Sequence, residues 1–155
     1  MKLLVLSDSH GAVGPMERAV SALAPDYVLH LGDRARDARE LEAWFPELPL
    51  ISVPGNCDFP APSEPLTLVR EFGGVPVLLT HGHAYGVKQG LLRLELAARE
   101  AGVRVAVFGH THRPFCEEHD GLWLLNPGSC GYGRDAYGLI WIEDGSVRCE
   151  AGELD

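Results

Sequence analysis

The feature that most constrains the fold of this chain is a series of short apolar runs separated by segments with helical periodicity. The runs are too short for typical helices, are rich in Val, Ile and Leu, and end at polar or glycine residues, which is typical of buried strands. Six of them come first: Lys2–Leu6, Tyr27–Leu31, Leu50–Val53, Leu66–Phe72, Val75–Leu79 and Arg104–Phe108. Amphipathic segments after Pro15, after Asp37 and over Leu91–Glu100 predict helices between them. This alternation predicts an α/β fold.

The helical periodicity stops after residue 114. Four apolar runs follow, joined in pairs by turns at Asp120-Gly121 and Asp144-Gly145: Pro114–Glu118, Leu122–Asn126, Ala136–Ile142 and Val147–Glu150. We therefore expect antiparallel strands here, so that an α/β part is followed by a β part. With 155 residues, the chain is expected to form one domain over residues 1–155.

The composition excludes several classes of protein. Hydrophobic residues make up 46% of the chain and charged residues 23%, which is ordinary for a soluble globular domain. The apolar start, Lys2–Leu6, leads directly into Ser7 and Asp8, so it is too short for a signal peptide or a membrane span. We expect a cytoplasmic protein that does not bind membranes.

The net charge and the spacing of the cysteines exclude further classes of function. A net charge of −9 argues against extended nucleic-acid binding, because clustered Lys and Arg side chains carry the non-specific part of such binding. A small anionic substrate is compatible with this charge where a local cation attracts it. The four cysteines include no C-x-x-C pair, so they indicate free thiols rather than a zinc ribbon or a disulfide framework.

Residues of metal-ligand type follow five of the predicted strands: Asp8, His10, Asp33, Asn56, His81, His110 and His112. One Asp, Asn or His after a strand is more often a turn, cap or hydrogen-bonded residue than a ligand. In an open α/β sheet, however, the carboxyl ends of strands converge on one crevice, so these residues could meet there. Glycines precede three of the groups, at Gly32, Gly55 and Gly109, and allow the backbone to pack closely around a centre.

The donor types indicate which metals would bind. Two Asp, one Asn and four His form a mixed nitrogen and oxygen set without thiolate, which suits Mn, Fe, Zn, Co or Ni better than Ca or Mg. Seven residues are too many for one tetrahedral ion. They suit two ions about 3.5–4 Å apart that share one carboxylate, an arrangement that stabilises in-line displacement at phosphorus.

The motifs Asp8-x-His10, Gly32-Asp33, Gly55-Asn56, His81 and Gly109-His110-x-His112 resemble the ordered set of the calcineurin-like metallophosphoesterases. The later Asn126-Pro127-Gly128-Ser129 also resembles the small, uncapped YfcE-type phosphodiesterases of that superfamily. The resemblance implies a sandwich of two mixed β-sheets flanked by α-helices. It further implies one ion held by Asp8, His10, Asp33 and His112, and a second held by Asp33, Asn56, His81 and His110.

The function implied by this resemblance is hydrolysis of a small phosphodiester by in-line attack of a metal-bridging hydroxide. The implied catalytic residues are Asp33, Asn56, His81 and His110, with Asn56 and His83 as candidates for substrate contact. Manganese is the first expected metal, and Ni, Fe, Zn and Co are alternatives. Alternative functions are a phosphomonoesterase or nuclease of the same superfamily, or a non-catalytic scaffold resembling Vps29. Open sheet edges are compatible with a homodimer.

Cys57 is the point at which the chain departs from the wider superfamily. A His that interacts with the leaving group typically follows the Asn of this motif, whereas Cys57 follows Asn56 here and the next residue, Asp58, keeps the expected carboxylate. The small YfcE-type proteins resemble this form. We interpret Cys57 as neither a metal ligand nor a nucleophile, while a weak role near the leaving oxygen stays open.

Overall fold

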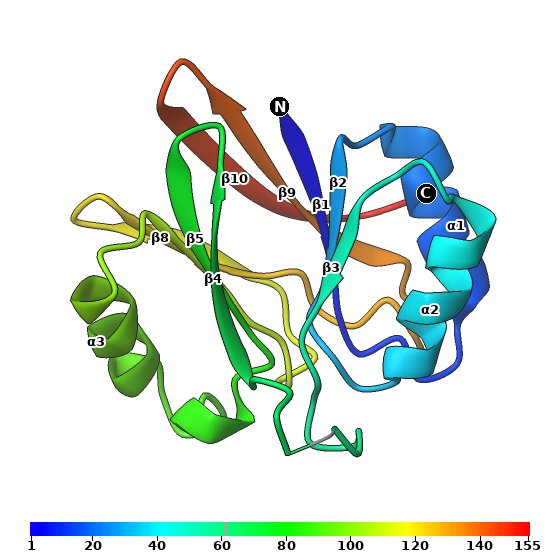
Figure 1. Ribbon diagram of the computed structural model, residues 1–155, viewed down its shortest axis with the longest axis horizontal. Coiled ribbons are helices and arrows are strands. Elements are labelled where there is room, and N and C mark those ends of the chain that lie inside the picture. The colour runs from blue at the N-terminus through cyan, green and yellow to red at the C-terminus, as the bar shows by residue number, and fades with distance from the viewer. Residues whose placement is uncertain (61) are drawn as a thin grey trace.

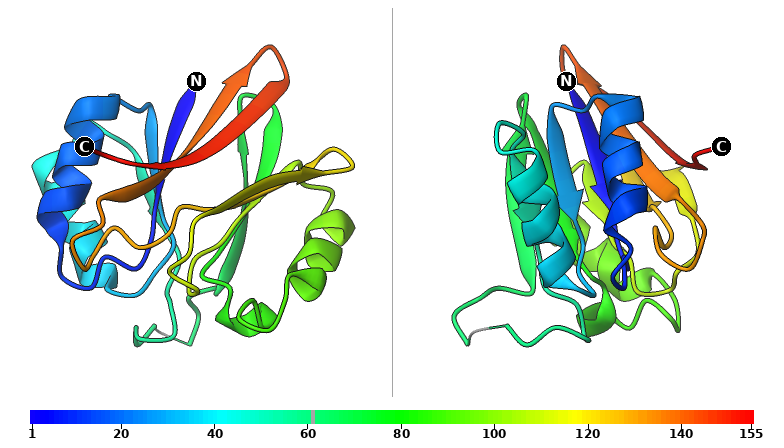
Figure 2. Two further views of the ribbon diagram at one scale, coloured as in Figure 1. Left: turned by 180° about the vertical axis from the view of Figure 1, so that it is seen from behind. Right: turned by 90° about the vertical axis from the view of Figure 1, so that its right-hand side faces the viewer.

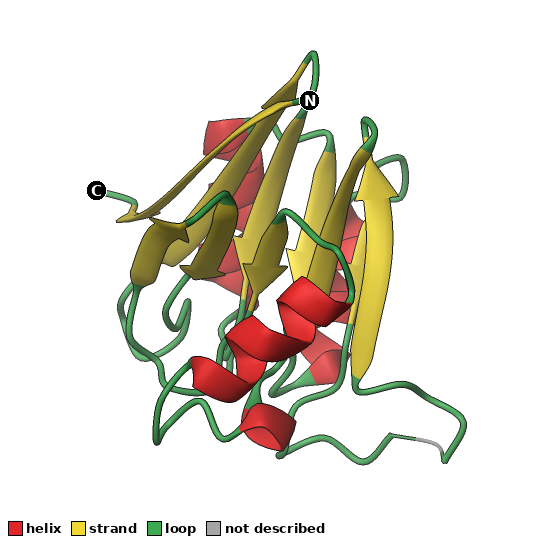
Figure 3. Cartoon of the chain, turned by 90° about the vertical axis from the view of Figure 1, so that its left-hand side faces the viewer, coloured by secondary structure: helices red, strands yellow, loops and turns green. Residues whose placement is uncertain are grey.

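Two five-stranded mixed sheets pack against each other and are flanked by helices on their outer faces (Figure 1). The structure is a computed structural model that describes residues 1–60 and 62–155. In Figure 3, α3 lies in front of the strands and the other two long helices lie behind them. This arrangement confirms the α/β sandwich expected from the sequence.

The first sheet has the strand order β10-β9-β1-β2-β3. Its strands are β1 (Lys2–Leu6), β2 (Tyr27–His30), β3 (Leu50–Ser52), β9 (Ala136–Glu143) and β10 (Ser146–Glu153). The first three are parallel, and the crossovers between them contain α1 (Val13–Leu23) and α2 (Ala35–Trp44). β9 runs antiparallel to both β1 and β10, which makes the sheet mixed.

The second sheet has the strand order β4-β5-β6-β8-β7. Its strands are β4 (Thr67–Phe72), β5 (Val75–Thr80), β6 (Val105–Val107), β7 (Phe115–His119) and β8 (Leu122–Asn126). β5, β6 and β8 are parallel, while β4 and β7 form antiparallel edges. The short 3-10 helix η1 (His83–Tyr85) and α3 (Leu92–Glu100) connect β5 to β6.

The expected β part does not form a unit of its own. Its two hairpins form as predicted, but β7-β8 joins the second sheet beside β6, and β9-β10 joins the first sheet beside β1. β8 is buried on both faces: Leu125 packs between the sheets, while Leu122 and Leu124 pack toward α3. A strand with two apolar faces needs a layer of structure on each side. The second sheet provides both layers for β8, whereas a separate antiparallel sheet with one face in solvent would not.

The core has a layer between the sheets and a layer beneath the helices. Along β1, Leu3 and Val5 point into the layer between the sheets, whereas Leu4 and Leu6 contact the cluster formed with α1 and α2. All four side chains are fully buried. A strand covered on both faces needs a continuous apolar run, which explains why β1 lacks polar alternation.

The carboxyl ends of the central strands of both sheets open at one end of the sandwich, and the N-terminus lies at the opposite end (Figures 1 and 2). Within each sheet, a backbone hydrogen bond links neighbouring strand ends: Gly109 N donates to His81 O at 2.9 Å in the second sheet, and Asp8 N donates to Gly32 O at 3.0 Å in the first. Loops that are distant in the sequence therefore meet here. Within the described ranges, no helix combines the length and the apolar character needed to cross a bilayer.

Candidate metal centre

The structure brings together the seven residues predicted from the strand ends. Donor atoms fall into two groups, each with all atoms within 4.8 Å of one another: Asp8, His10, Asp33 and His112, and Asp33, His81 and His110. Asn56 joins the second group, because its Oδ1 lies 3.0 Å from His81 Nε2. Asp33 belongs to both groups, in the position expected of a shared carboxylate.

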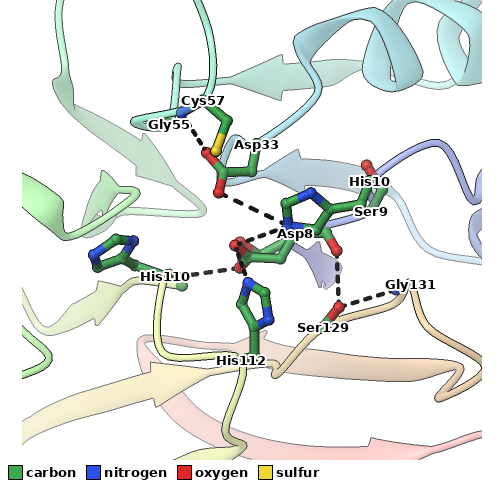
Figure 4. A network of polar contacts seen from close by, with 12 residues as sticks. Asp8, Ser9, His10, Asp33, Gly55, Cys57, His110, His112, Ser129 and Gly131 are labelled. Carbon is green, nitrogen blue, oxygen red and sulfur yellow. Dashed lines mark hydrogen bonds and ion pairs between the residues drawn. The ribbon is translucent and has the colours of Figure 1, made fainter.

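In the first group, the side chains of Asp8, His10, Asp33 and His112 converge on one another (Figure 4). Asp8 Oδ1 lies 3.1 Å from His112 Nε2 and 3.9 Å from His10 Nε2, and His10 Nε2 lies 3.8 Å from Asp33 Oδ2. Asp8 Oδ1 and His10 Nε2 are buried and have no hydrogen-bond partner among the described residues. A buried polar atom without a partner is costly, and a bound cation would satisfy both atoms.

Asp8 uses its other carboxylate oxygen to fix the opposite loop. Asp8 Oδ2 accepts hydrogen bonds from Ser7 Oγ at 2.6 Å and from His110 N at 3.1 Å. Only Oδ1 is left facing the imidazoles. This division of roles orients the carboxylate before any ligand binds.

In the second group, the tautomer of His81 follows from its contacts. His81 Nδ1 lies 2.7 Å from Leu31 O, which can only accept, so Nδ1 carries the hydrogen. In the neutral ring, Nε2 then presents a lone pair, and it faces His110 Nδ1 at 3.2 Å and Asp33 Oδ2 at 3.4 Å. The His81 lone pair and the Asp33 carboxylate thus converge on one point, as the ligands of a metal ion do.

The charges of the site shift the pKa values of its central groups. Burial acts to raise the pKa of Asp33, but its contact with the His81 ring and the hydrogen bond from Cys57 N outweigh it, so the pKa is lowered and the carboxylate stays ionised. Burial acts to lower the pKa of His81, but the contact with Asp33 and the negative charges of Asp8 and Asp33 raise it. Both shifts follow in part from the attraction between His81 and the carboxylates beside it, whereas burial and the neighbouring His81 lower the pKa of His110.

The backbone is strained at most of the predicted ligands. Five of them have left-handed φ angles: Asp8 (55°), His10 (46°), Asp33 (58°), His110 (69°) and His112 (60°). This conformation costs a non-glycine residue about 1–2 kcal/mol, and such strain clusters at functional sites. The surrounding packing therefore holds these side chains in directions that a relaxed backbone would not adopt.

The three glycines that precede predicted ligands are required by close packing. A methyl group on Gly55 would overlap Asp33 Oδ1, and one on Gly109 would overlap Ser7 Oγ and lie 2.7 Å from Asp8 Oδ2. A methyl group on Gly32 would overlap the Gly55 backbone. The expected role of these glycines in allowing a crowded centre is confirmed.

Asp58 joins the Asp33 loop to the Gly55 loop. Its carboxylate accepts four backbone hydrogen bonds, from Asp33 N, Arg34 N and Ala35 N at 2.9 Å and from Gly55 N at 2.8 Å. These bonds cap the first turn of α2, which explains why this helix begins at Ala35, before the expected start near Asp37. They also lower the pKa of Asp58, although burial acts in the opposite direction.

Sequence reasoning missed a buried polar network behind the site. Asp37 Oδ2 accepts hydrogen bonds from Ser9 Oγ and Gly11 N, both at 2.7 Å, and Ser9 Oγ lies 3.1 Å from His30 Nε2. The network holds the loop that carries His10. One signal was present, because Asp37 lies four residues before the core residue Leu41 and so falls on the buried face of α2.

Two further residues lie beside the centre. The ring of His83 is 5.5 Å from that of His81 and 6.2 Å from that of His110, so the predicted substrate-contact candidate is at the site. Tyr132, which the sequence did not reveal, lies with its ring 5.2 Å from His10 and 5.9 Å from His112. Tyr132 is 71% exposed, so it forms an outer rim of the centre.

The chain belongs to the calcineurin-like phosphoesterase superfamily, whose domain matches residues 1–142. It is 35% identical to the probable metallophosphoesterase YsnB of Bacillus subtilis, over 93% of this chain and 86% of that protein. It is 30% identical to the phosphodiesterase YfcE of Escherichia coli, over 90% of this chain and 87% of that protein. Membership of this superfamily and the two donor groups agree with divalent metal binding.

Solved structures show the same fold. A predicted phosphoesterase from Streptococcus pneumoniae is similar with a TM-score of 0.78 and 27% identity, over 97% of this chain and 87% of that one. Vps29 from Entamoeba histolytica, crystallised with Zn²⁺, is similar with a TM-score of 0.73 and 24% identity, over 99% of both chains. The second similarity concerns the fold alone.

The backbone strain at His112 gives a stability prediction. His112→Gly and His112→Ala both remove the imidazole, but only glycine relieves the left-handed φ of 60°. We expect the glycine variant to be more stable by about 1 kcal/mol, measured by urea unfolding of metal-free protein. Glu42 is an exposed residue in α2, and the pair Glu42→Gly and Glu42→Ala serves as the control. There the alanine variant should be the more stable of the two, because glycine destabilises a helix. Equal stability of the two His112 variants would show that the strain is absent.

Asp58→Asn tests the link between the two loops. The amide has one acceptor oxygen in place of two, so it cannot keep all four backbone bonds, and we expect a loss of about 2 kcal/mol at pH 7. Because folding lowers the pKa of Asp58, the difference should persist above the ordinary carboxyl range and shrink as the pH falls below it. Asp120→Asn, in an exposed turn, is the control and should change stability little. A difference that grows on acidification would contradict this account.

Proposed function

We propose that this chain hydrolyses a small phosphodiester with the help of two divalent transition-metal ions. The observation that carries the proposal is the Asp33 carboxylate, which belongs to both groups of donor atoms. Asp8, His10, Asp33 and His112 would hold one ion, and Asp33, Asn56, His81 and His110 the other. The unpartnered Asp8 Oδ1 and His10 Nε2 fit this assignment, because a cation would satisfy both.

The donor chemistry favours a borderline metal, and manganese is the first choice to test. Imidazole nitrogens and carboxylate or amide oxygens without thiolate suit Mn, Fe, Co, Ni and Zn. Two such ions supply Lewis acidity to a phosphoryl oxygen and lower the pKa of water toward ~7. The chain's own part is to hold the donors in place, neutralise the ions and orient the phosphate.

Several residues support these tasks by their contacts. The Leu31 carbonyl fixes the tautomer of His81, so its Nε2 lone pair faces the centre. Cys57 N donates to Asp33 Oδ1 at 3.0 Å, which leaves Oδ2 facing His10 and His81. His83 Nδ1 is buried without a partner among the described residues beside His110, and we expect it to contact a phosphate oxygen or the departing group.

The phosphodiester assignment is supported by the similarity to YfcE, which is named a phosphodiesterase. A scaffold role of the Vps29 kind is the alternative, because Vps29 shares the fold. Retention of all seven donor residues in one place favours the enzyme. The acidic charge of −9 argues against an extended nucleic-acid substrate.

Asp33→Asn and His83→Ala should differ in both metal content and activity. Mn-loaded wild-type protein should contain two ions per chain and hydrolyse bis(4-nitrophenyl) phosphate. Asp33→Asn keeps the shape of a shared ligand but loses its charge, so we expect one ion or none and a fall in kcat/KM of more than about a hundredfold. His83→Ala should keep both ions and lose about tenfold or less.

Elemental analysis and steady-state kinetics check this prediction. A folded wild-type protein with at most one ion would contradict the two-metal proposal. Equal losses of activity in the two variants, with both ions retained, would assign a catalytic role to His83 and remove the special role of Asp33. Metal binding without hydrolysis of phosphodiesters or phosphomonoesters would favour the scaffold alternative.

Cys57→Ala should keep both ions and most of the activity on a nitrophenyl phosphodiester. The Cys57 backbone N–H binds Asp33, and this bond survives the substitution, while the thiol is absent from both donor groups within the described residues. Nitrophenolate leaves without protonation, so a proton donor is not required. A loss beyond about a thousandfold with both ions bound would mean that the thiol takes part in the chemistry.

A further inference from the structure

A second concave region lies beside the candidate metal centre and contains none of its donor residues. This cavity of about 600 Å³ is lined by Val87, Lys88, Leu91, Phe108, Thr111, Arg113, Pro114 and Phe115. We call it the ring pocket. Its volume falls within the range of small-molecule sites, roughly 300–1,000 Å³.

The ring pocket adjoins the loop that carries two predicted ligands. Thr111 lies between His110 and His112, and Phe108 precedes Gly109 and His110, so the segment Phe108–Arg113 borders both the pocket and the centre. Thr111 and Arg113 also line a smaller hollow of about 340 Å³ that includes His112 and Tyr132. Lys88 lines the same cavity as Thr111 and Arg113, so its ammonium lies on the pocket that adjoins this loop.

The lining combines apolar walls with cationic side chains. The rings of Phe108 and Phe115 are 6.3 Å apart, and Val87 and Leu91 pack in the same hydrophobic cluster. Lys88 and Arg113 are exposed, and among the described residues neither lies within 4.0 Å of a carboxylate in an ion pair. In a chain of net charge −9, two such cations beside apolar walls favour an anion that carries an apolar group.

We propose that the ring pocket binds one ester group of the substrate, and that this group is a flat ring such as a nucleobase or an aryl group. The phosphate would face the donor residues, with Lys88 and Arg113 adding positive charge beside it. This inference rests on the proposed phosphoesterase function and narrows its substrate class. The chain should therefore prefer ring-bearing phosphodiesters to alkyl phosphodiesters.

Phosphonates test this preference without turnover. Methylphosphonate and phenylphosphonate carry the same anionic group and differ only in the ring, and neither is hydrolysed by phosphoester chemistry. In calorimetric titrations of Mn-loaded protein, we expect phenylphosphonate to bind at least about tenfold tighter. A ratio of dissociation constants below about threefold would overturn the ring-pocket proposal.

Two neighbouring leucines provide a matched pair of variants. Leu91 lines the pocket, whereas Leu92 lies outside its lining and its side chain is 69% exposed. Leu91→Trp should fill the cavity and reduce the phenyl-to-methyl ratio to near one, while Leu92→Trp should keep the wild-type ratio. If Leu91→Trp does not fold, Leu91→Ala serves instead and should weaken phenylphosphonate severalfold with methylphosphonate unchanged. A wild-type ratio in the folded Leu91 variant would overturn the proposal.

The cationic contribution is tested separately. Lys88→Gln should weaken both phosphonates by a similar factor and leave their ratio unchanged, because it removes charge and not apolar contact. Arg93→Gln, an exposed cation on α3 outside the pocket lining, is the control and should change neither. If the protein binds methylphosphonate but shows no ring preference, only the ring-pocket proposal fails. If the Mn-loaded protein binds neither phosphonate, the ring-pocket proposal fails, and the ion content and hydrolysis of bis(4-nitrophenyl) phosphate decide separately whether the proposed function fails as well.

Discussion

The contact between His81 Nδ1 and the Leu31 carbonyl joins the two sheets at the point where the candidate site forms. His81 follows β5 of the second sheet, and Leu31 follows β2 of the first, so this 2.7 Å hydrogen bond holds the two strand ends together. It also fixes the tautomer of His81, so that Nδ1 carries the hydrogen and Nε2 presents the lone pair. This bond therefore helps to hold the sheets together at this end, and it sets the direction of the lone pair that faces Asp33, Asn56 and His110. The remaining donors are arranged around it.

Several features of the candidate site lower the stability of the fold, and a bound cation would offset part of this loss. Left-handed backbone angles, unpartnered buried atoms and two adjacent carboxylates all cost folding free energy in one small region. The compensation lies outside it, in the buried apolar layers and in Asp58, whose four backbone bonds fix the Asp33 and Gly55 loops. The surrounding fold thus holds the donor residues in backbone conformations that they would not adopt on their own.

Sequence patterns predicted most of the strands and the residues of the candidate site, because both depend on local order along the chain. Apolar runs and the polar residues at their ends can be read one segment at a time. The division of the two C-terminal hairpins between different sheets could not be read, since it depends on which strand covers β1 and β6. The start of α2 was also misplaced, because its capping carboxylate, Asp58, comes from a loop 23 residues beyond Ala35. The position of Tyr132 beside the centre and the formation of the ring pocket both require side chains from separate loops to meet in space. The spacing of residues along the sequence does not predict such contacts.

The position of β9 beside β1 affects how the protein can fold while it is being synthesised. β1 lies between β2 and β9, so one edge of the first strand stays unpaired until residues 136–143 have been synthesised. The loop after β1 also waits for late residues, because Ser129 Oγ donates to Asp8 O and Cys130 N donates to Ser7 O. A nascent chain that already contains all seven donor residues, through His112, therefore still lacks two of the hydrogen bonds that hold the Ser7–Asp8 backbone. The centre matures only at the end of synthesis, and until then β1 exposes a β-edge open to pairing with other chains.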